Sequence, residues 1–272
     1  MVTADGQVRI VNACTNADLF WGLKGGGGGS LGVVTRLTLR TRELPAVFGA
    51  VGGTVKAASD VAFRRLIARF VGFYGDSLLN PHWGESVTFA ADNSLIITMV
   101  FQGLESRQAQ AAWQPFIDWL AASRDYTVAS PIEVSVMPAQ HWWDAAYVEQ
   151  NRHGRAFTDE RPGAPEDNIW FAEQNTELGM FIHGFESVWL PEALLRKDRQ
   201  GRLADALFAA TRSWAVALHF NKGLAGANPA DVARAKDAAK NPAMLTAFAL
   251  AIIAGGDPAA YANPSYSALR RG

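Results

Sequence analysis

A run of glycines near the amino terminus is the feature of this sequence with the most direct chemical meaning. Gly25–Gly29 is followed by Ser30, Leu31 and Gly32. Main chain that carries no Cβ atoms can approach a large flat or anionic ligand closely, and its successive N–H groups can bind an anion. The alternatives are a tight turn in which glycine only permits close packing, and a flexible Gly/Ser linker. The apolar segments on both sides of the run argue against the linker.

Two familiar nucleotide motifs fit this run poorly. The spacing Gly27-x-Gly29-x-x-Gly32 matches the dinucleotide-binding fingerprint, but that motif needs a strand before it and a helix after it. Here we expect a helix at 16–24 before the glycines and a strand at 33–41 after them, which is the reverse order. No Lys-Ser or Lys-Thr pair follows, so the phosphate loop of nucleotide hydrolases is excluded. An NAD-dependent enzyme that uses these glycines is kept as an alternative hypothesis.

A second group of candidate residues lies in the irregular stretch from Met137 to Pro165, which is rich in Trp, His, Arg and Gly. Long irregular segments inside compact domains are often functional. His141, Trp142 and Tyr147 are candidates to line a substrate slot, because aromatic faces stack on sugar rings and polycyclic compounds. The alternative is an edge cluster that only packs a long loop.

The sequence lacks the patterns of metal and disulfide chemistry. No set of His, Asp and Glu has the spacing of metal ligands, so no metal is predicted. The one cysteine, Cys14, cannot form an internal disulfide, and we expect it to be a small buried residue. His219 is expected to be a hydrogen-bonded histidine of the interior, which is also one interpretation of His183. Asp159–Pro165 is expected to be a surface turn.

These residues must be positioned by two regions that meet at Leu44-Pro45. We expect residues 1–44 to form the carboxyl-terminal end of one domain and residues 45–272 to form another. In the second region, hydrophobic spacing predicts the order strand, helix, strand, strand, helix, strand at 47–56, 59–74, 86–91, 94–101, 105–123 and 128–136. This order predicts the α+β fold class, with an antiparallel sheet covered by helices.

Further elements are predicted on either side of this unit. A strand at 179–189, a helix at 194–214 and a strand at 216–221 follow it. Asn228-Pro229 and Asn241-Pro242 are each expected to open a helix, with asparagine as the cap and proline at the first helical position. Near the amino terminus we expect a short strand at 8–12 and asparagine capping of the helix at 16–24.

Composition restricts the classes of function. The 272 residues carry 25 Lys and Arg against 26 Asp and Glu, a net charge of -1, which argues against nucleic acid as a partner. The longest dense apolar run, Ala243–Ala254, is about half as long as a membrane-spanning helix, so no membrane partner is expected. The first residues lack the features of a signal peptide, which makes a cytoplasmic location the default expectation.

Residues 16–41 resemble a known family. Their sequence, NADLFWGLKGGGGGSLGVVTRLTLRT, with the preceding Val2-Thr-Ala-Asp-Gly, is similar to the end of the FAD-binding domain of the vanillyl-alcohol oxidase superfamily, closest to its berberine-bridge-enzyme-like branch of FAD-linked oxidases. The stretches HWWD, DERPGAP, HGFESVWLP and HFNKGLAG, which begin at His141, Asp159, His183 and His219, resemble the substrate domain of bacterial members. The resemblance implies the tail of a PCMH-type FAD-binding domain followed by a substrate domain.

The resemblance implies FAD as the cofactor. The residues it places against FAD are Gly25, Gly26, Gly27, Gly28, Gly29, Ser30, Gly32, Val33 and Val34. The family's flavin-attachment half, with its covalent histidine, would lie upstream of Met1, and the berberine-bridge segment would follow Gly272. We therefore expect an internal fragment, incomplete at the end of its substrate domain, that binds FAD weakly or not at all.

The resemblance also implies a chemistry, in which a hydroxyl or C–N group of a sugar or secondary metabolite is oxidised by hydride transfer to flavin N5. A base must then take the substrate proton, and burial over an apolar flavin would raise the pKa of a carboxyl group toward neutrality. Candidate bases are Glu173, Glu177 and Tyr147, with Glu186 nearby. Candidate substrate-binding residues are His141, Trp142 and His183. The glutamates are alternatively solvated loop acids.

Two other functions are compatible with the sequence. The chain is alternatively a catalytically silent sugar- or ligand-binding module, or one half of a split flavoenzyme. In each case the expected partner is a small molecule. Surfaces left exposed by the missing segments are candidates for self-association.

Overall fold

The computed structural model describes residues 1–165, 167–172 and 179–257. Its α-helices are α1 (Ala17–Leu23), α2 (Asp60–Phe73), α3 (Ser106–Ala121), α4 (Ala145–Asn151), α5 (Lys197–Thr211) and α6 (Pro229–Lys236). Its strands are β1 (Val47–Ala57), β2 (Trp83–Phe89), β3 (Ser94–Gln102), β4 (Tyr126–Pro138), β5 (Ala156–Thr158), β6 (Ile169–Phe171), β7 (Phe181–Pro191), β8 (Val216–His219) and β9 (Ala247–Asp257). Short helical turns are the π-helix η1 (Tyr74–Leu78) and the 3-10 helices η2 (Ala139–His141), η4 (Glu192–Leu195) and η5 (Pro242–Leu245).

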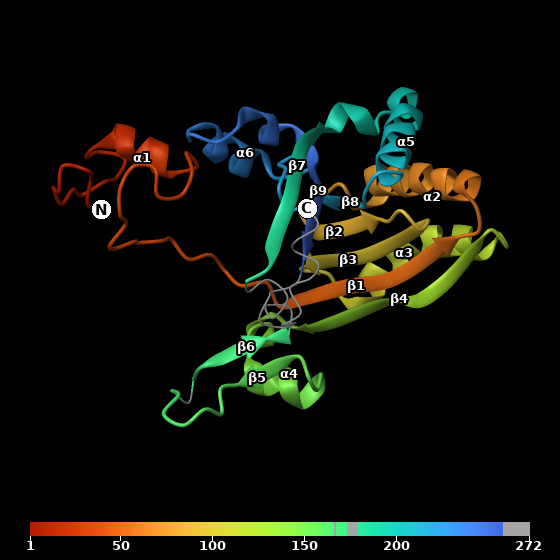
Figure 1. Ribbon diagram of the computed structural model, residues 1–272, viewed down its shortest axis with the longest axis horizontal. Helices are drawn as coiled ribbons and strands as arrows, with labels where there is room; N and C mark the ends of the chain where they lie inside the picture. Colours follow the sequence, from red (N-terminus) through yellow and green to blue (C-terminus); the bar gives the residue numbers. More distant parts are fainter. Residues whose placement is uncertain (166, 173–178, 258–272) are drawn as a thin grey trace.

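A seven-stranded sheet in the order β4-β1-β3-β2-β8-β9-β7 is the frame of the molecule. Every neighbouring pair in it is antiparallel. Strands β5 and β6 form a separate two-stranded ribbon below it (Figure 1). The predicted order from 47 to 136 is confirmed as β1-α2-β2-β3-α3-β4, and with it the α+β class.

Helices α2, α3 and α5 pack on one face of this sheet and bury the hydrophobic core against it. Helix α2 begins where Ser59 Oγ accepts a hydrogen bond from the N–H of Ala62, because serine is a favourable residue at a helix amino terminus. Its apolar spacing then places Phe63, Ile67 and Phe70 fully inside. Burying each such side chain stabilises the fold by about 1.5–3 kcal/mol. Figure 1 shows α2 and α5 side by side above the strands and α3 behind them.

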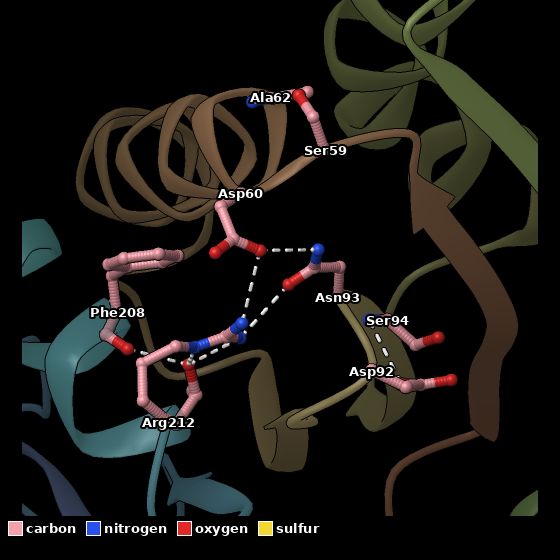
Figure 2. Close-up of polar contacts among 9 residues, drawn as sticks. Ser59, Asp60, Ala62, Asp92, Asn93, Ser94, Phe208 and Arg212 are labelled. Atoms are coloured by element: carbon pink, nitrogen blue, oxygen red, sulfur yellow. Dashed lines mark hydrogen bonds and ion pairs between the residues drawn. The ribbon is translucent and has the colours of Figure 1, made fainter.

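A polar cluster joins this helical layer to a turn of the sheet. The guanidinium of Arg212, at the end of α5, donates to Asp60 at 3.2 Å and to Asn93 at 2.9 Å. Asn93 lies in the β2–β3 turn with φ 69, a left-handed conformation that asparagine tolerates, and it donates to Asp60. The same guanidinium lies over the rings of Phe63 and Phe208. Figure 2 shows the three elements meeting at this arginine.

The amino-terminal 44 residues hold less regular structure than predicted. Helix α1 is confirmed, although Asn16 does not cap it through its side chain and instead donates to the carbonyl of Ile10. The strands predicted at 8–12 and 33–41 are wrong, because only isolated bridges from Val2 to Val8 and Val33 form there. Residues 33–41 alternate like a strand, but within the described residues they find no partner strand, and Leu37 and Leu39 are 70% and 74% exposed.

The carboxyl-terminal part also departs from prediction. Asn241 does accept the N–H of Ala243, but the element it opens is the short η5, so the second predicted helix is wrong. The apolar run that follows forms β9, which the sequence analysis missed. A short continuous apolar run does not distinguish a strand from a helix by its periodicity, and the Asn241-Pro242 signal directly before this run favoured a helix. The irregular stretch after Met137 also contains η2, α4 and β5.

Candidate functional site

The face of the sheet opposite the three helices carries a row of small, polar and aromatic side chains. Ser86 and His219 alternate with core residues of β2 and β8, so they point away from the helical layer. We call this surface the open face. Paired residues form one row across it: Glu133, Gly52, Thr98, Ser86, His219, Leu250 and Trp189. Side chains directly opposite one another in such pairs are about 4.5–5.5 Å apart at Cβ.

The centre of this row combines a hydroxyl pair with an imidazole. The hydroxyl groups of Ser86 and Thr98 are hydrogen-bonded at 2.9 Å, and Thr98 also donates to the carbonyl of Ser86. His219 is half-buried beside them, and within the described part of the chain its ring has no hydrogen-bond partner. The prediction of a hydrogen-bonded interior histidine at this position is therefore wrong.

Partial burial of His219 favours the neutral form of its ring. Burial lowers the pKa of His219; the nearby carboxylate of Glu85 opposes this effect, and Lys222 adds to it. Glu85 has a left-handed backbone with φ 61, and its carboxylate accepts a hydrogen bond from Asn221 at 2.5 Å. A neutral imidazole has one nitrogen that accepts and one that donates. His219 can therefore take part in both kinds of hydrogen bond.

The segment that follows β4 folds back over one end of the open face. The ring of Trp142 packs edge-on against Phe48 of β1 at 5.6 Å between centroids. From the end of α4, Arg152 donates to the hydroxyl of Ser135 on β4 at 3.0 Å. Phe48 and Ser135 both belong to the open face, because they alternate with residues that pack on the core. The irregular stretch singled out by the sequence therefore does border this surface.

Within this segment, the predicted residues His141 and Tyr147 form one cluster with Asp144. The imidazole Nδ1 of His141 lies 2.9 Å from the carboxylate of Asp144, and its ring stacks on Tyr147 at 4.2 Å. Asp144 also caps α4 by accepting the N–H of Tyr147; this bond, followed by the contact with His141, lowers the pKa of Asp144. The carboxylate fixes the orientation of the imidazole. Trp142, as described, lies against the sheet.

The other predicted site residues lie at the far edge of the sheet or outside the described residues. His183 on the edge strand β7 contacts Asp257 of β9 at 2.8 Å. Glu186 alternates with Ser187 and points to the same side of the sheet as the helices, away from the open face. Glu173 and Glu177 lie outside the described residues.

The glycine run forms an irregular loop whose two ends are packed and whose middle is open. Gly25, Gly27, Gly29 and Gly32 have positive φ angles, which glycine adopts without strain. A Cβ on Gly25 would lie 2.3 Å from Cγ of Lys240, and one on Gly32 would lie 2.3 Å from the carbonyl oxygen of Val2. A Cβ on Gly28 or Gly29 would meet nothing within 4 Å. Close packing within the chain therefore explains the outer glycines, and open space surrounds the central ones.

Some backbone N–H groups of the same loop are hydrogen-bonded within the chain and others are not. Gly26 donates to the carbonyl of Gly22, and Val33 exchanges two hydrogen bonds with Val2 at 2.8 Å each. Across the described residues, the N–H groups of Gly27–Gly29 have no backbone or side-chain acceptor. These three amides are free donors of the loop, as are those of Ser30, Leu31 and Gly32 among the described residues. The side chains of Val33 and Val34 are exposed.

Contacts with α6 and the residues after it fix the loop in space. Lys24 pairs with Asp237 at 3.2 Å, and the N–H of Ala239 donates to the carbonyl of Trp21. Figure 1 shows α1 beside α6. Cys14 precedes α1 and is exposed, so the prediction that it is buried is wrong. It lies in a run of turns stabilised by Asn12, whose side chain accepts its N–H.

A groove of about 470 Å³ lies elsewhere, between α2 and α5 on the helical side of the sheet. Its charged groups are paired, since Arg64 contacts Asp205 across it at 2.5 Å, and Asp60 and Arg65 contact Arg212 and Asp125. It holds none of the predicted site residues. None of the helices in the described ranges is long and apolar enough to cross a membrane.

Comparisons with known proteins give this geometry a context. No family model matches the chain. The VAO-type flavoprotein oxidase VAO615 of Thermothelomyces thermophilus is 32% identical over 171 residues, which are 59% of this chain and 28% of that protein. Other curated relatives, matched over 40 to 125 residues, are FAD-linked oxidoreductases. The chain spans less than a third of the length of these relatives.

Solved structures match almost the entire chain. The crystal structure of the VAO-type flavoprotein MtVAO615 from Myceliophthora thermophila superposes with a TM-score of 0.65 and 21% identity over 99% of this chain and 43% of that one. A glucooligosaccharide oxidase from Acremonium strictum gives a TM-score of 0.61 and 18% identity over 100% of this chain and 50% of that one. The homologues of this chain are therefore FAD-linked oxidoreductases and VAO-type flavoproteins, and its fold is that of the matching part of a VAO-type flavoprotein.

Proposed function

We propose that this chain forms the substrate-binding part of an FAD-dependent oxidoreductase, in which the open face of the sheet receives the substrate. The substrate would be a sugar or secondary metabolite with a hydroxyl or C–N group to be oxidised. The observation that carries this proposal is the row of polar side chains, Thr98, Ser86 and His219, on the sheet face opposite the helices, in a fold shared with FAD-linked relatives. One of the matching structures is a glucooligosaccharide oxidase.

The glycine loop fits a role in holding FAD. It has free amides at Gly27–Gly29 and open space at Gly28 and Gly29, and a flat or anionic group can rest on such bare backbone. The backbone of Val33 is already paired with Val2, so this residue would offer only its side chain. When bound, FAD would accept a hydride from the substrate at its N5 atom.

The residues of the open face would bind and orient the substrate. Ser86 and Thr98 offer hydroxyl groups, which both donate and accept hydrogen bonds. Trp142 borders the face at one end and Trp189 ends the row at the other, and aromatic side chains suit the apolar faces of sugar rings. The cluster of His141, Asp144 and Tyr147 lies beside Trp142 and would support the end of the site.

An FAD titration of the purified chain tests the cofactor part of the proposal. Gly28→Val adds a side chain to the open part of the loop at a position where φ is not positive and no atom lies within 4 Å. The variant should fold normally and bind FAD roughly tenfold more weakly, because the added side chain keeps FAD from the amides. Quenching of flavin fluorescence measures the affinity.

The matched control is Gly201→Ala on α5, which also has no atom within 4 Å and should bind FAD as the unchanged chain does. Equal FAD affinity of the chain and its Gly28→Val variant would contradict the proposed role of the loop. If cellobiose binds but FAD does not, also after the flavin-binding half of an FAD-linked relative is supplied, the chain is a ligand-binding module instead.

A further inference from the structure

His219 combines three properties that the row around it does not share. It carries the imidazole of the row, it is half-buried between β2 and β9, and within the described residues its ring is unpartnered, whereas the carboxylate of the row, Glu133, lies exposed on the edge strand β4. Its neighbours Ser86 and Thr98 satisfy each other at 2.9 Å. A half-buried imidazole whose ring has no partner among the described residues keeps its hydrogen-bonding capacity available to a ligand.

The register places His219 where a ligand bound to the hydroxyl pair would reach it. Ser86 is its direct partner across β2 and β8, which brings the two side chains to neighbouring positions on the same surface. Leu250 on the other side is apolar and gives the ring no acceptor or donor. A ligand group bound over Ser86 therefore lies next to the imidazole of His219.

Two charged groups near His219 shift the pKa of its ring in opposite directions. Glu85 lies on β2 and is already held by Asn221, while Lys222 follows β8. Burial outweighs the carboxylate and lowers the pKa of the ring, so near neutral pH it is a free hydrogen-bond acceptor. A neutral imidazole in contact with a hydroxyl group has the properties of a general base.

We propose that His219 accepts the proton of the substrate hydroxyl group that is oxidised, while the Ser86–Thr98 pair positions that group. This inference rests on the proposed function. In the step, the O–H bond breaks and its proton binds to the imidazole. The C–H bond breaks with its electron pair, which leaves as hydride to the flavin, and the carbon–oxygen double bond forms. The two electrons lost by the alcohol reduce the flavin, and the imidazolium later returns its proton to solvent.

Nitrogen-15 NMR of the histidine rings tests this without turnover, with cellobiose as the probe. A hydroxyl group that donates to the neutral imidazole stabilises the neutral form, so saturation with cellobiose should lower the pKa of His219 further. The ring of His153, which is 83% exposed and lies 3.6 Å from Glu149, is the internal reference and should not move.

Variants separate a direct contact from a structural effect. His219→Leu should weaken cellobiose binding by about tenfold, His219→Asn should restore part of it because the amide oxygen can accept a hydrogen bond, and His153→Asn should have no effect. A ring of His219 that cellobiose leaves unchanged, or whose pKa rises on binding, overturns the proposal. If cellobiose then perturbs the amides of Ser86 and Thr98 alone, the open face remains the substrate site and only the role of His219 fails.

Discussion

Asp159 shows how one side chain can hold an irregular segment together. Its carboxylate is 4% exposed and accepts hydrogen bonds from the backbone and guanidinium of Arg161 and from Asn168. The contacts with Arg161 come first among those that lower its pKa to about 2, from 3.8. The turn at Asp159–Pro165 is as predicted, but its first residue is buried and ties β5 to β6.

This linkage gives a pH-dependent stability with a defined sign. Because the folded-state pKa is lowered, the stabilisation by Asp159 is fully present above 3.8 and is lost as the pH falls toward about 2. Asp159→Asn should therefore lower the melting temperature near neutral pH, and the difference from the unchanged chain should shrink as the pH approaches about 2. A difference that is constant over this range would show that Asp159 stabilises the turn by packing alone. Thermal unfolding monitored by circular dichroism measures the melting temperatures of the variant and the unchanged chain.

Among the elements, α2 and α5 depend on the arginine that joins them to the β2–β3 turn. Arg212→Lys keeps the charge but cannot reach Asp60 and Asn93 together, and it loses the planar contact with Phe208. We expect a loss of about 1–2 kcal/mol in the free energy of unfolding, measured by urea denaturation. Arg199→Lys, at an exposed pair 3.9 Å from Asp198, should change it by less than ~0.5 kcal/mol. Equal effects of the two substitutions would refute the role of the cluster.

An element is predictable from the sequence when the residues that form it also carry the signal for it. Helix α2 combines a capping serine with apolar residues at helical spacing, and both signals lie within its own residues. Residues 33–41 carry strand alternation, yet a strand also needs a neighbour, and alternation alone does not supply one. Strand β9 was missed for a different reason, because its residues form a continuous apolar run, whose periodicity does not distinguish a strand from a helix.

The candidate site was predictable only where aromatic or glycine-rich motifs mark it. His141, Trp142 and Tyr147 stood out by type, and the structure brings them to one end of the open face. Ser86, Thr98 and Arg152 carry no such signal, since serine and threonine are ordinary in exposed strand positions. Their significance comes from a register between strands that are far apart in sequence, which local patterns do not encode.

At the scale of the whole molecule, the glycine loop depends on the segment at α6 for its position. Gly25→Ala would drive a Cβ into Lys240, whereas Gly29→Ala, also at positive φ, would meet no atom within 4 Å. Both substitutions strain the backbone, but only the first should detach the loop from α6. We expect faster hydrogen exchange across 17–32 and 229–240 in Gly25→Ala, and a change confined to the loop in Gly29→Ala. Identical exchange patterns in the two variants would show that contact with α6 does not position the glycine loop.

The strand order also sets a sequence of events for the growing polypeptide. Strands β4, β1, β3 and β2 come from one continuous stretch, 47–138, whereas β8, β9 and β7 come from 181–257 and join through β8 alone. Short-range pairing closes faster than pairing between distant segments. The first four strands can therefore assemble while the ribosome still holds the rest, and the imidazole of β8 reaches Ser86 only when this late-arriving unit docks.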